Sequence, residues 1–291
     1  MAKPLVVITG KNGQLGWELM QAVALVVMPF EFLFTDRTEI DLGDPSSIIS
    51  FFGKYKPAYF VNCAAYTAVD KAETEQELAY TVNGESVGVI ARECNKINCT
   101  LIQLSTDYVF DGTASKPYKP DSATDPVNYY GYTKWIGEKL AMENNTRTVV
   151  VRTSWVYSTH GNNFVNTMLR LMQERKELKV VSDQLGSPTY ALDLANAILR
   201  IIAILEKGDH HYGVYHFSNE GIISWFDFAT AIRDVAGLSC EILPQPTSAY
   251  PTPAKRPAYS VLDKTAIIQD FGITLRNWKE ALEEALSKKT G

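Results

Sequence analysis

The sequence predicts an α/β protein, in which a doubly wound parallel sheet is joined to a smaller, partly discontinuous α/β domain. In the first half of the 291 residues, continuous apolar segments of strand length alternate with helix-like segments, and a glycine-rich turn follows the first of them. Strands that are apolar throughout are typical of parallel sheets with helices on both faces. The second half is less regular, and five of the 13 prolines lie between Pro244 and Pro257.

The predicted elements follow one another as alternating strands and helices. Predicted strands cover residues 5–9, 31–35, 58–63, 100–105 and 148–152. Predicted helices cover residues 13–27, 45–55, 71–80, 84–95 and 128–143, and Asp44 is a suitable cap for the second of them. In the second half, we predict helices at residues 163–174 and 192–205, a strand at 216–219, and strand and loop at 244–257.

Composition and charge limit the classes of function. Apolar and charged contents of 46% and 21% are ordinary for a globular protein, and a net charge of −5 argues against a nucleic-acid partner. The four cysteines form no C-x-x-C pair, so we expect free thiols in a reducing compartment. The longest apolar stretch, residues 22–30, is too short to cross a membrane, and no targeting segment is visible. We therefore expect a cytoplasmic protein without a membrane partner.

The turn after the first strand carries the pattern G-x-x-G-x-x-G, with Gly10, Gly13 and Gly16. Glycine permits a tight turn and lets backbone amides approach a pyrophosphate, and the N-terminus of the next helix adds partial positive charge. The spacing differs from the G-x-G-x-x-G fingerprint of dinucleotide-binding proteins, and such a turn can be purely structural. Because this one joins a strand directly to a helix, we predict a nucleotide site on a Rossmann-type sheet.

Acidic and basic residues follow the second predicted strand. Asp36 lies where an acid binds the adenosine ribose of NAD, whereas its neighbour Arg37 suits the 2′-phosphate of NADP. NADH and NADPH therefore both remain open, and the structural alternative is a solvated charge pair at a strand end. Asp41 and Leu42 come next, and we expect them at the edge of the adenine.

Tyr130 and Lys134 lie four residues apart on a predicted helix, so their side chains share one face. A nearby ammonium favours phenolate and lowers the tyrosine pKa from its usual ~10, which makes a usable proton donor. The spacing alone is also common on helix surfaces. Thr106, at the end of the fourth strand, is placed either to hold a substrate oxygen or to cap a turn.

Several short motifs carry a resemblance to one family. They are T-G-x-x-G-x-x-G at residues 9–16, N-C-A-A at 62–65, T-A-V-D-x-A-E at 67–73, S-T-D-Y-V-F-x-G at 105–112, Y-x-x-x-K at 130–134, R-T-S-W-V-Y at 152–157, G-N-N-F at 161–164, D-Q-L-G-S-P-T at 183–189 and P-T-P-A-K-R-P at 251–257. Over nearly the whole chain, the set resembles the extended short-chain dehydrogenase/reductase superfamily and, within it, the dTDP-4-dehydrorhamnose reductase family.

The resemblance implies that NADPH or NADH reduces the 4-keto group of dTDP-4-dehydro-β-L-rhamnose to give dTDP-L-rhamnose. It implies that Tyr130 protonates the carbonyl oxygen, that Lys134 binds the nicotinamide ribose and lowers the Tyr130 pKa, and that Thr106 hydrogen-bonds the same oxygen. It also implies two sets of binding residues. The cofactor set has Gly13, Gln14 and Leu15 at the pyrophosphate and Ala65, Tyr66 and Thr67 over the third strand, and the sugar-nucleotide set is Thr106, Asp107, Trp155, Asn163 and Arg256.

Two members of the sugar-nucleotide set also suit their roles chemically. Arg256 suits a diphosphate, because its guanidinium is a planar fork of donors. Trp155 offers an apolar face to a sugar ring, although simple core packing is its structural alternative.

One position separates this chain from related enzymes. Sugar-nucleotide 4,6-dehydratases of the same superfamily carry Thr-Asp-Glu, and their glutamate removes a proton at carbon 5. The third position here is Tyr108, which has no carboxylate. The local chemistry therefore favours reduction over dehydration. Two alternatives stay open: another nucleotide-sugar epimerase or reductase of the superfamily, and a non-catalytic regulatory subunit like that of methionine adenosyltransferase.

The resemblance also bears on domains and partners. We assign residues 1–155 and 189–218 to a dinucleotide-binding Rossmann domain, and residues 156–188 and 219–291 to a sugar-nucleotide domain. The expected partners are a dTDP-sugar substrate and a second copy in a homodimer. Members of this family have been described with magnesium at a dimer interface, but the sequence has no acid cluster that we can assign as its ligands.

Overall fold

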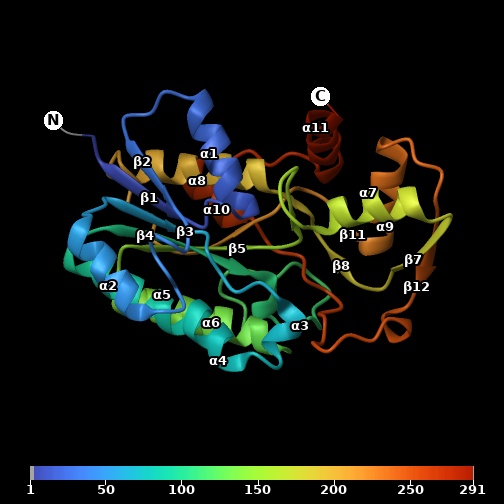
Figure 1. Cartoon of the computed structure of the whole chain (residues 1–291), viewed down its shortest axis with the longest axis horizontal. Helices are drawn as coiled ribbons and strands as arrows, with labels where there is room; N and C mark the ends of the chain where they lie inside the picture. The colour runs from blue at the N-terminus through green and yellow to red at the C-terminus, as the bar shows by residue number, and fades with distance from the viewer. Residues whose placement is uncertain (1–2, 291) are drawn as a thin grey trace.

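The computed structural model describes residues 3–290 and centres on a six-stranded parallel sheet (Figure 1). The strand order is β10-β5-β4-β3-β1-β2, and all neighbours are parallel. The bounds are β1 Leu5–Thr9, β2 Glu31–Thr35, β3 Tyr59–Asn62, β4 Thr100–Thr106, β5 Thr148–Thr153 and β10 Gly213–Phe217. The chain runs outward from β1 to β2 and then returns to β3 on the other side of β1. This confirms the predicted doubly wound sheet and creates a switch point beside β1.

Helices cover both faces of the sheet, as the apolar strands predict. In Figure 1, α1 Gln14–Leu25, α8 Ala191–Leu205 and α10 Thr265–Phe271 lie above the sheet, and α2 Pro45–Lys54, α5 Ser86–Lys96 and α6 Tyr129–Asn144 lie below it. Asp44 caps α2 as predicted, because its carboxylate accepts a hydrogen bond from the amide of Ser46.

The helical structure predicted near residues 71–80 is confirmed in part. The chain forms two short helices, α3 Val69–Ala72 and α4 Gln76–Tyr80, and then a π-helical segment, Thr81–Glu85, that leads into α5. The side chain of Glu73 lies at the break and accepts a hydrogen bond from the amide of Tyr129, at the start of α6. A tertiary contact therefore interrupts a segment that local propensity treats as one helix.

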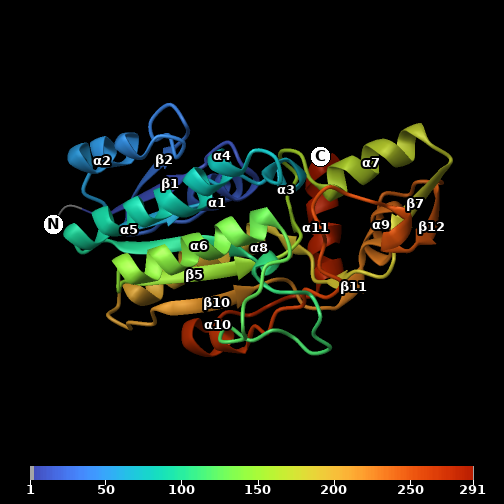
Figure 2. The same ribbon diagram turned by 90° about the horizontal axis from the view of Figure 1, so that it is seen from below.

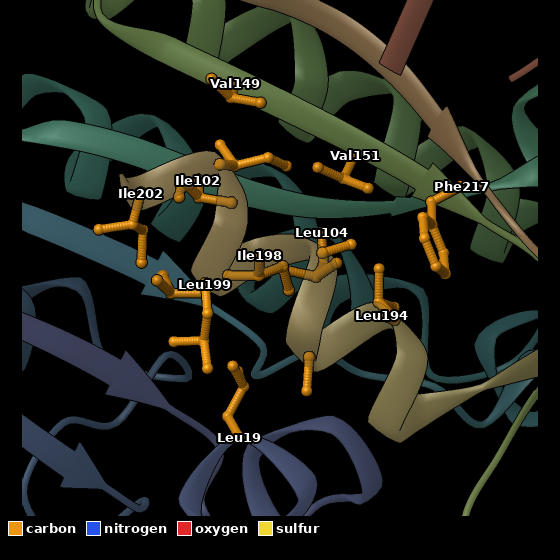
Figure 3. Packing of buried hydrophobic residues seen from close by; sticks show 14 of the residues in the cluster. Leu19, Ile102, Leu104, Val149, Val151, Leu194, Ile198, Leu199, Ile202 and Phe217 are labelled. Atoms are coloured by element: carbon orange, nitrogen blue, oxygen red, sulfur yellow. The ribbon is translucent and has the colours of Figure 1, made fainter. Parts of the chain in front are cut away.

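Side chains of successive strand residues point to opposite faces of the sheet, where they pack into two apolar cores. Val6 and Ile8 pack toward α1 and α8, whereas Val7 packs toward α2 and α5. Figure 3 shows the first core, in which Ile102, Leu104, Val149 and Val151 of β4 and β5 lie near Leu194 and Ile198 of α8. The sheet is therefore packed between apolar cores on both faces.

A second region lies to the right in Figure 2 and has a core of its own. Its helices are α7 Phe164–Glu174, α9 Trp225–Val235 and α11 Trp278–Thr290. Its strands form short pairs: β6 Val156–Tyr157 with β9 Thr189–Tyr190, β7 Glu177–Val181 with β12 Glu241–Gln245, and β8 Leu185–Gly186 with β11 Ile223–Ser224. Ser224 and Asp227 form a capping box at the start of α9.

The structure bears on two features that the composition was used to predict, the state of the cysteines and membrane-spanning segments. The four cysteines are free, and all except Cys63 are buried. No helix between residues 3 and 290 is long and apolar enough to span a membrane.

Candidate active site

A cavity of about 650 Å³ opens at the carboxyl ends of the central strands. Gly10, Asp36 and Cys63 line it directly after β1, β2 and β3, and Ser105 lines it near the end of β4. The cavity therefore lies at the switch point, where parallel sheets bind their ligands.

The glycine turn forms one wall of the cavity and requires glycine. Gly10 has a positive φ of 73°, and a Cβ atom on Gly16 would lie 2.2 Å from the carbonyl oxygen of Gly10. Gly16 therefore does not line the cavity but lets α1 pack against the turn. Helix α1 begins after Gly13 without a side-chain cap from any residue that the structure describes. Its first amides are thus free to bind an anion.

All the other predicted cofactor residues line this cavity: Gly10, Gly13, Gln14, Leu15, Asp36, Arg37, Asp41, Leu42, Ala65, Tyr66, Thr67, Tyr130 and Lys134. Their contact with a dinucleotide stays a prediction. Sequence reasoning missed several further lining residues, among them Asn12, Ala64, Val156, Gly161 and Asn162. The last three belong to the R-T-S-W-V-Y and G-N-N-F motifs, but they lie far from the glycine turn in the sequence, and the motifs alone do not assign them to its cavity.

Charged side chains are paired at the end of the cavity beside β2. Asp36 accepts hydrogen bonds from the amide and hydroxyl of Thr38, at 2.9 and 2.7 Å, and its carboxylate lies 3.1 Å from the ammonium of Lys11. These contacts hold the pKa of Asp36 well below its usual range. Arg37 lies 3.0 Å from Asp41 and its side chain is 77% exposed. Two carboxylates, of Asp36 and Asp41, and two cations, of Lys11 and Arg37, thus lie at this end, which is compatible with both NADH and NADPH.

The loop after β3 is held in place by Asn83, which sequence reasoning missed. Its side-chain amide exchanges two hydrogen bonds of 2.9 Å with the backbone of Tyr66 and also donates to the Thr133 hydroxyl at 3.1 Å. Asn83 lies in the π-helical segment and is buried. It therefore links a predicted cofactor loop to helix α6.

Tyr130 and Lys134 lie together on the first turns of α6 and both line the cavity. The helix packs closely here, because a Cβ atom on Gly131 would lie 2.1 Å from the carbonyl oxygen of Tyr108. The ammonium of Lys134 donates to the carbonyl oxygen of Leu104 at 2.7 Å. Burial lowers the pKa of Lys134 to about 8, although Glu138 opposes this shift.

The pKa of Tyr130 shifts upward, whereas the spacing from Lys134 predicts a downward shift; the contribution of Lys134 itself stays a prediction. Burial raises the pKa of Tyr130 to about 12, and a hydrogen bond with Thr106 only partly offsets it. The desolvation of a phenolate therefore outweighs the stabilisation from its neighbours. Tyr130 keeps its proton at neutral pH, as a proton donor must.

Thr106 connects Tyr130 to a buried carboxyl group. Its hydroxyl donates to Asp107 at 3.0 Å and accepts from the amide of Tyr108 at 3.2 Å, and it lies near enough to Tyr130 to oppose the rise in the Tyr130 pKa. The Tyr108 ring packs edge-on against Tyr130, with ring centres 5.7 Å apart. The structure therefore brings these four side chains into one cluster.

The remaining predicted substrate residues do not line the cavity. Trp155 stacks on Trp225 at 3.6 Å, and a Cβ atom on Gly186 would lie 2.6 Å from its indole. Asn163 caps α7 and donates to the carbonyl oxygen of Ser158 at 2.8 Å. Arg256 forms an ion pair with Asp70 at 2.8 Å. All three side chains are thus occupied by other residues of the chain.

A buried ion pair lies one helical turn beyond Lys134. The carboxylate of Glu138 accepts two hydrogen bonds from Arg152, at 2.9 and 2.7 Å, and a third from Ser105. Both charged side chains are about 5% exposed. The i, i+4 spacing of Lys134 and Glu138 was visible in the sequence, but the partner on β5 was not.

Among residues 3–290, no group of three or more His, Cys, Asp or Glu side chains is arranged to hold a metal ion. Magnesium, which only the family resemblance suggested, therefore gains no assigned ligands from the described residues.

Comparison with known proteins finds a family and relatives that match nearly the whole chain. A family model described as the RmlD substrate binding domain matches residues 4–290. The spore coat polysaccharide biosynthesis protein SpsK of Bacillus subtilis is 42% identical, with 98% of each chain covered. A dTDP-4-dehydrorhamnose reductase of Burkholderia thailandensis is 43% identical over 95% of this chain and 96% of its own.

A solved structure shares the fold closely. The crystal structure of dTDP-4-dehydrorhamnose reductase from Bacillus anthracis in complex with NADP superposes with a TM-score of 0.91 and 37% identity, covering 98% of this chain and 99% of the other.

Proposed function

The chain belongs to the RmlD substrate binding domain family, and from this premise we propose that it is an NAD(P)H-dependent oxidoreductase of nucleotide sugars. The specific reaction proposed is reduction of the 4-keto group of dTDP-4-dehydro-β-L-rhamnose to give dTDP-L-rhamnose, a step in dTDP-rhamnose biosynthesis. The observation that carries this proposal is the cluster of Tyr130, Lys134 and Thr106 beside the cavity that follows the glycine turn.

The residues around the cavity fit a dinucleotide. The turn at Gly10 and Gly16 leaves no space for a Cβ atom at either position, and the first amides of α1 are free. Gly13, Gln14 and Leu15 would hold the pyrophosphate there, and Asp36 or Arg37 the adenosine ribose or its phosphate. When bound, the reduced nicotinamide supplies a hydride. The NADP in the Bacillus anthracis relative supports NADPH, and the carboxylate of Asp36 supports NADH as a second cofactor.

The side chains beside the cavity supply the proton for the reduction. Tyr130 is protonated at neutral pH and donates its proton to the carbonyl oxygen of the sugar, while the Thr106 hydroxyl orients that oxygen. The ammonium of Lys134 offers positive charge near the phenolate that remains. Tyr108 packs against Tyr130 and has no carboxylate to remove a carbon-bound proton. This arrangement supports reduction rather than dehydration.

We also propose the remaining sequence assignments. Arg256 would bind the diphosphate after leaving Asp70, with Asp107, Trp155 and Asn163 around the sugar nucleotide. The separate core of α7, α9 and α11 supports a second domain, although α10 of the range 219–291 packs through Ile267 and Phe271 into the core of the sheet; the division into residues 1–155 and 189–218 and residues 156–188 and 219–291 stays a proposal. The free thiols support a cytoplasmic location. A homodimer rests on the family resemblance, and light scattering on the purified protein would test it.

A coupled assay tests the function. Purified protein, mixed with dTDP-4-dehydrorhamnose and each reduced cofactor in turn, should oxidise the cofactor in proportion to the sugar consumed. No oxidation above background with either cofactor would overturn the proposal. Protein that is purified with bound NAD and isomerises a sugar without added cofactor would indicate an epimerase. A stoichiometric protein partner, in the absence of reductase activity, would indicate a regulatory subunit.

A further inference from the structure

The segment of residues 158–162 joins β6 to α7 and reaches from the second region to the start of α1. The hydroxyl of Ser158 donates to the carboxylate of Glu18 in α1 at 2.6 Å and accepts from the amide of His160 at 3.0 Å. Ser158 and Glu18 are both buried, and 140 positions of sequence separate them. Their hydrogen bond therefore fixes where the 158–162 segment lies against α1.

The ring of His160 contacts both the glycine turn and α1. Its Nε2 atom lies 3.2 Å from the carbonyl oxygen of Asn12, and because a carbonyl only accepts, Nε2 carries the proton and donates. The same ring stacks on the indole of Trp17, with ring centres 5.1 Å apart and planes within 8° of parallel. His160 thus holds the segment against the turn that is proposed to bind the pyrophosphate.

The last two residues of the segment, Gly161 and Asn162, line the cavity. A Cβ atom on Gly161 would lie 3.6 Å from Cγ of Gln14, one of the residues proposed to hold the pyrophosphate. Gly161 has a positive φ of 77°, a conformation that favours glycine. The second region therefore contributes a wall of the cavity next to the glycine turn.

Asn162 presents hydrogen-bond donors at this wall. The carbonyl oxygen of Gly161 accepts from the side chain of Asn166 in α7 at 2.8 Å, so the N–H of Asn162, on the opposite side of the same trans peptide, points away from α7. The next side chain, Asn163, is committed to the backbone of Ser158 and Asn166. Asn162, in contrast, is exposed and lines the cavity. Its backbone and side-chain amides suit an anion.

We propose that the 158–162 segment is a second pyrophosphate-binding element of the dinucleotide site, in which Asn162 donates to the pyrophosphate and His160 is the positioning residue. This inference rests on the proposed dinucleotide-dependent function and deepens it. The first amides of α1 meet the pyrophosphate on one side, and Asn162 meets it from the wall that the second region contributes. His160 acts through Asn12 and Trp17, because these two contacts fix the distance between the walls. Cofactor affinity therefore depends on both regions of the chain.

The test measures the Kd of three probes by isothermal titration calorimetry. They are NADPH, 2′-phospho-ADP-ribose, which keeps the pyrophosphate without the nicotinamide, and 2′,5′-ADP, which has no pyrophosphate; NADH, ADP-ribose and AMP replace them if the wild type prefers NADH. Asn162→Ala should raise the Kd of the first two probes by roughly tenfold and leave that of 2′,5′-ADP within about twofold. Asn95, exposed near the end of α5, is the matched control, and Asn95→Ala should match the wild type for all three.

The positioning role of His160 is tested by graded substitution. His160→Ala removes the hydrogen bond to Asn12 and the stack on Trp17, so the Kd and KM for NADPH should rise by roughly tenfold, with kcat and the KM for the sugar nucleotide unchanged. His160→Gln keeps a side-chain donor and should raise them by only about threefold. His210 also stacks on an aromatic ring, that of Tyr212, but lies outside the segment. His210→Ala should therefore match the wild type.

The outcomes separate this proposal from the proposed function, because the binding measurements need no sugar substrate. A wild type that binds none of the probes overturns both. A wild type that binds NADPH but does not oxidise it with the dTDP-sugar overturns the reductase function alone. Unchanged NADPH affinity in Asn162→Ala, or an equal loss of 2′,5′-ADP affinity, overturns this proposal alone. Unchanged NADPH affinity in a folded His160→Ala overturns the positioning role, and if that variant fails to fold, the exposed substitution Asn162→Ala still decides.

Discussion

The cofactor side and the substrate side of the proposed site are built in different ways. The cofactor side is an open cavity at the start of α1, where no side chain of the described residues caps the helix. On the substrate side, Arg256 is paired with Asp70 and Trp155 is stacked on Trp225. The first side is ready to bind, whereas the second has to exchange internal partners for a ligand.

This difference indicates how each side selects its ligand. The first amides of α1 have no side-chain cap among residues 3–290, so their anion site is preformed. A paired arginine binds a new anion only when that anion replaces the carboxylate already present. We therefore expect variants on the cofactor side to act on cofactor affinity and stability, and variants on the substrate side to act on the KM for the sugar nucleotide.

The largest expected effect lies where the two sides meet, at Tyr130. Tyr130→Phe removes a proton donor used in the transition state, so kcat should fall by roughly 10²- to 10⁴-fold with little change in either KM. Steady-state kinetics measures this. Tyr132, exposed on the same helix, provides the control, and Tyr132→Phe should retain full activity. A large rise in KM with kcat preserved would assign Tyr130 to binding instead of proton transfer.

The next largest effect concerns the buried ion pair of Glu138 and Arg152. Glu138→Gln leaves the Arg152 guanidinium buried without its counter-charge, which should cost about 3–5 kcal/mol in the free energy of unfolding. The matched control is Glu174→Gln, because Glu174 and Arg170 form an exposed pair worth about 0–1 kcal/mol. Urea denaturation of both variants gives the comparison. Equal stabilities would show that the buried pair contributes no more than a surface one.

A smaller effect is expected within the cofactor side. The Cβ atom of Gly16→Ala would overlap the Gly10 carbonyl, so the turn must shift, at a cost of about 1–3 kcal/mol in stability and with weaker NADPH binding. Gly53 in α2 has open space around its Cβ position. Gly53→Ala should stabilise the protein by about 0.5–1 kcal/mol and leave cofactor affinity unchanged. Thermal unfolding and fluorescence titration with NADPH measure both. Unaltered NADPH affinity in Gly16→Ala would argue against a preformed turn.

The smallest expected effect concerns the substrate side. Asp70→Asn weakens the internal competitor for Arg256, so the KM for the sugar nucleotide should fall by less than about fivefold, as suits a partly exposed ion pair of about 1 kcal/mol or less. Asp41→Asn, which disturbs the Arg37 pair at the other end, should change the KM for the cofactor instead. If the two variants changed the same KM, the contrast between the sides would be wrong.

Most of the fold was predictable because its signals are local. Apolar runs of strand length predicted β1 and β2 at their observed bounds, and the glycine pattern predicted the turn before α1. The candidate site was predictable where it follows the backbone, since the ends of parallel strands meet at one edge. The break between α3 and α4 was not predictable from residues 71–80 alone, because the contact of Glu73 at this break with the start of α6 crosses more than fifty residues of chain.

The sequence by itself determined the doubly wound sheet, the glycine turn and the shared helix face of Tyr130 and Lys134, because strand and helix periodicities and glycine conformations are properties of neighbouring residues. Only the tertiary structure decided how those groups are charged and paired. In the folded chain, Asp70 forms an ion pair with Arg256, and Arg152 forms one with Glu138 of α6. Burial raises the pKa of Tyr130, although the spacing from Lys134 predicted a lower value. Burial and pairing depend on residues that are distant in the chain, so they exist only once the chain is packed.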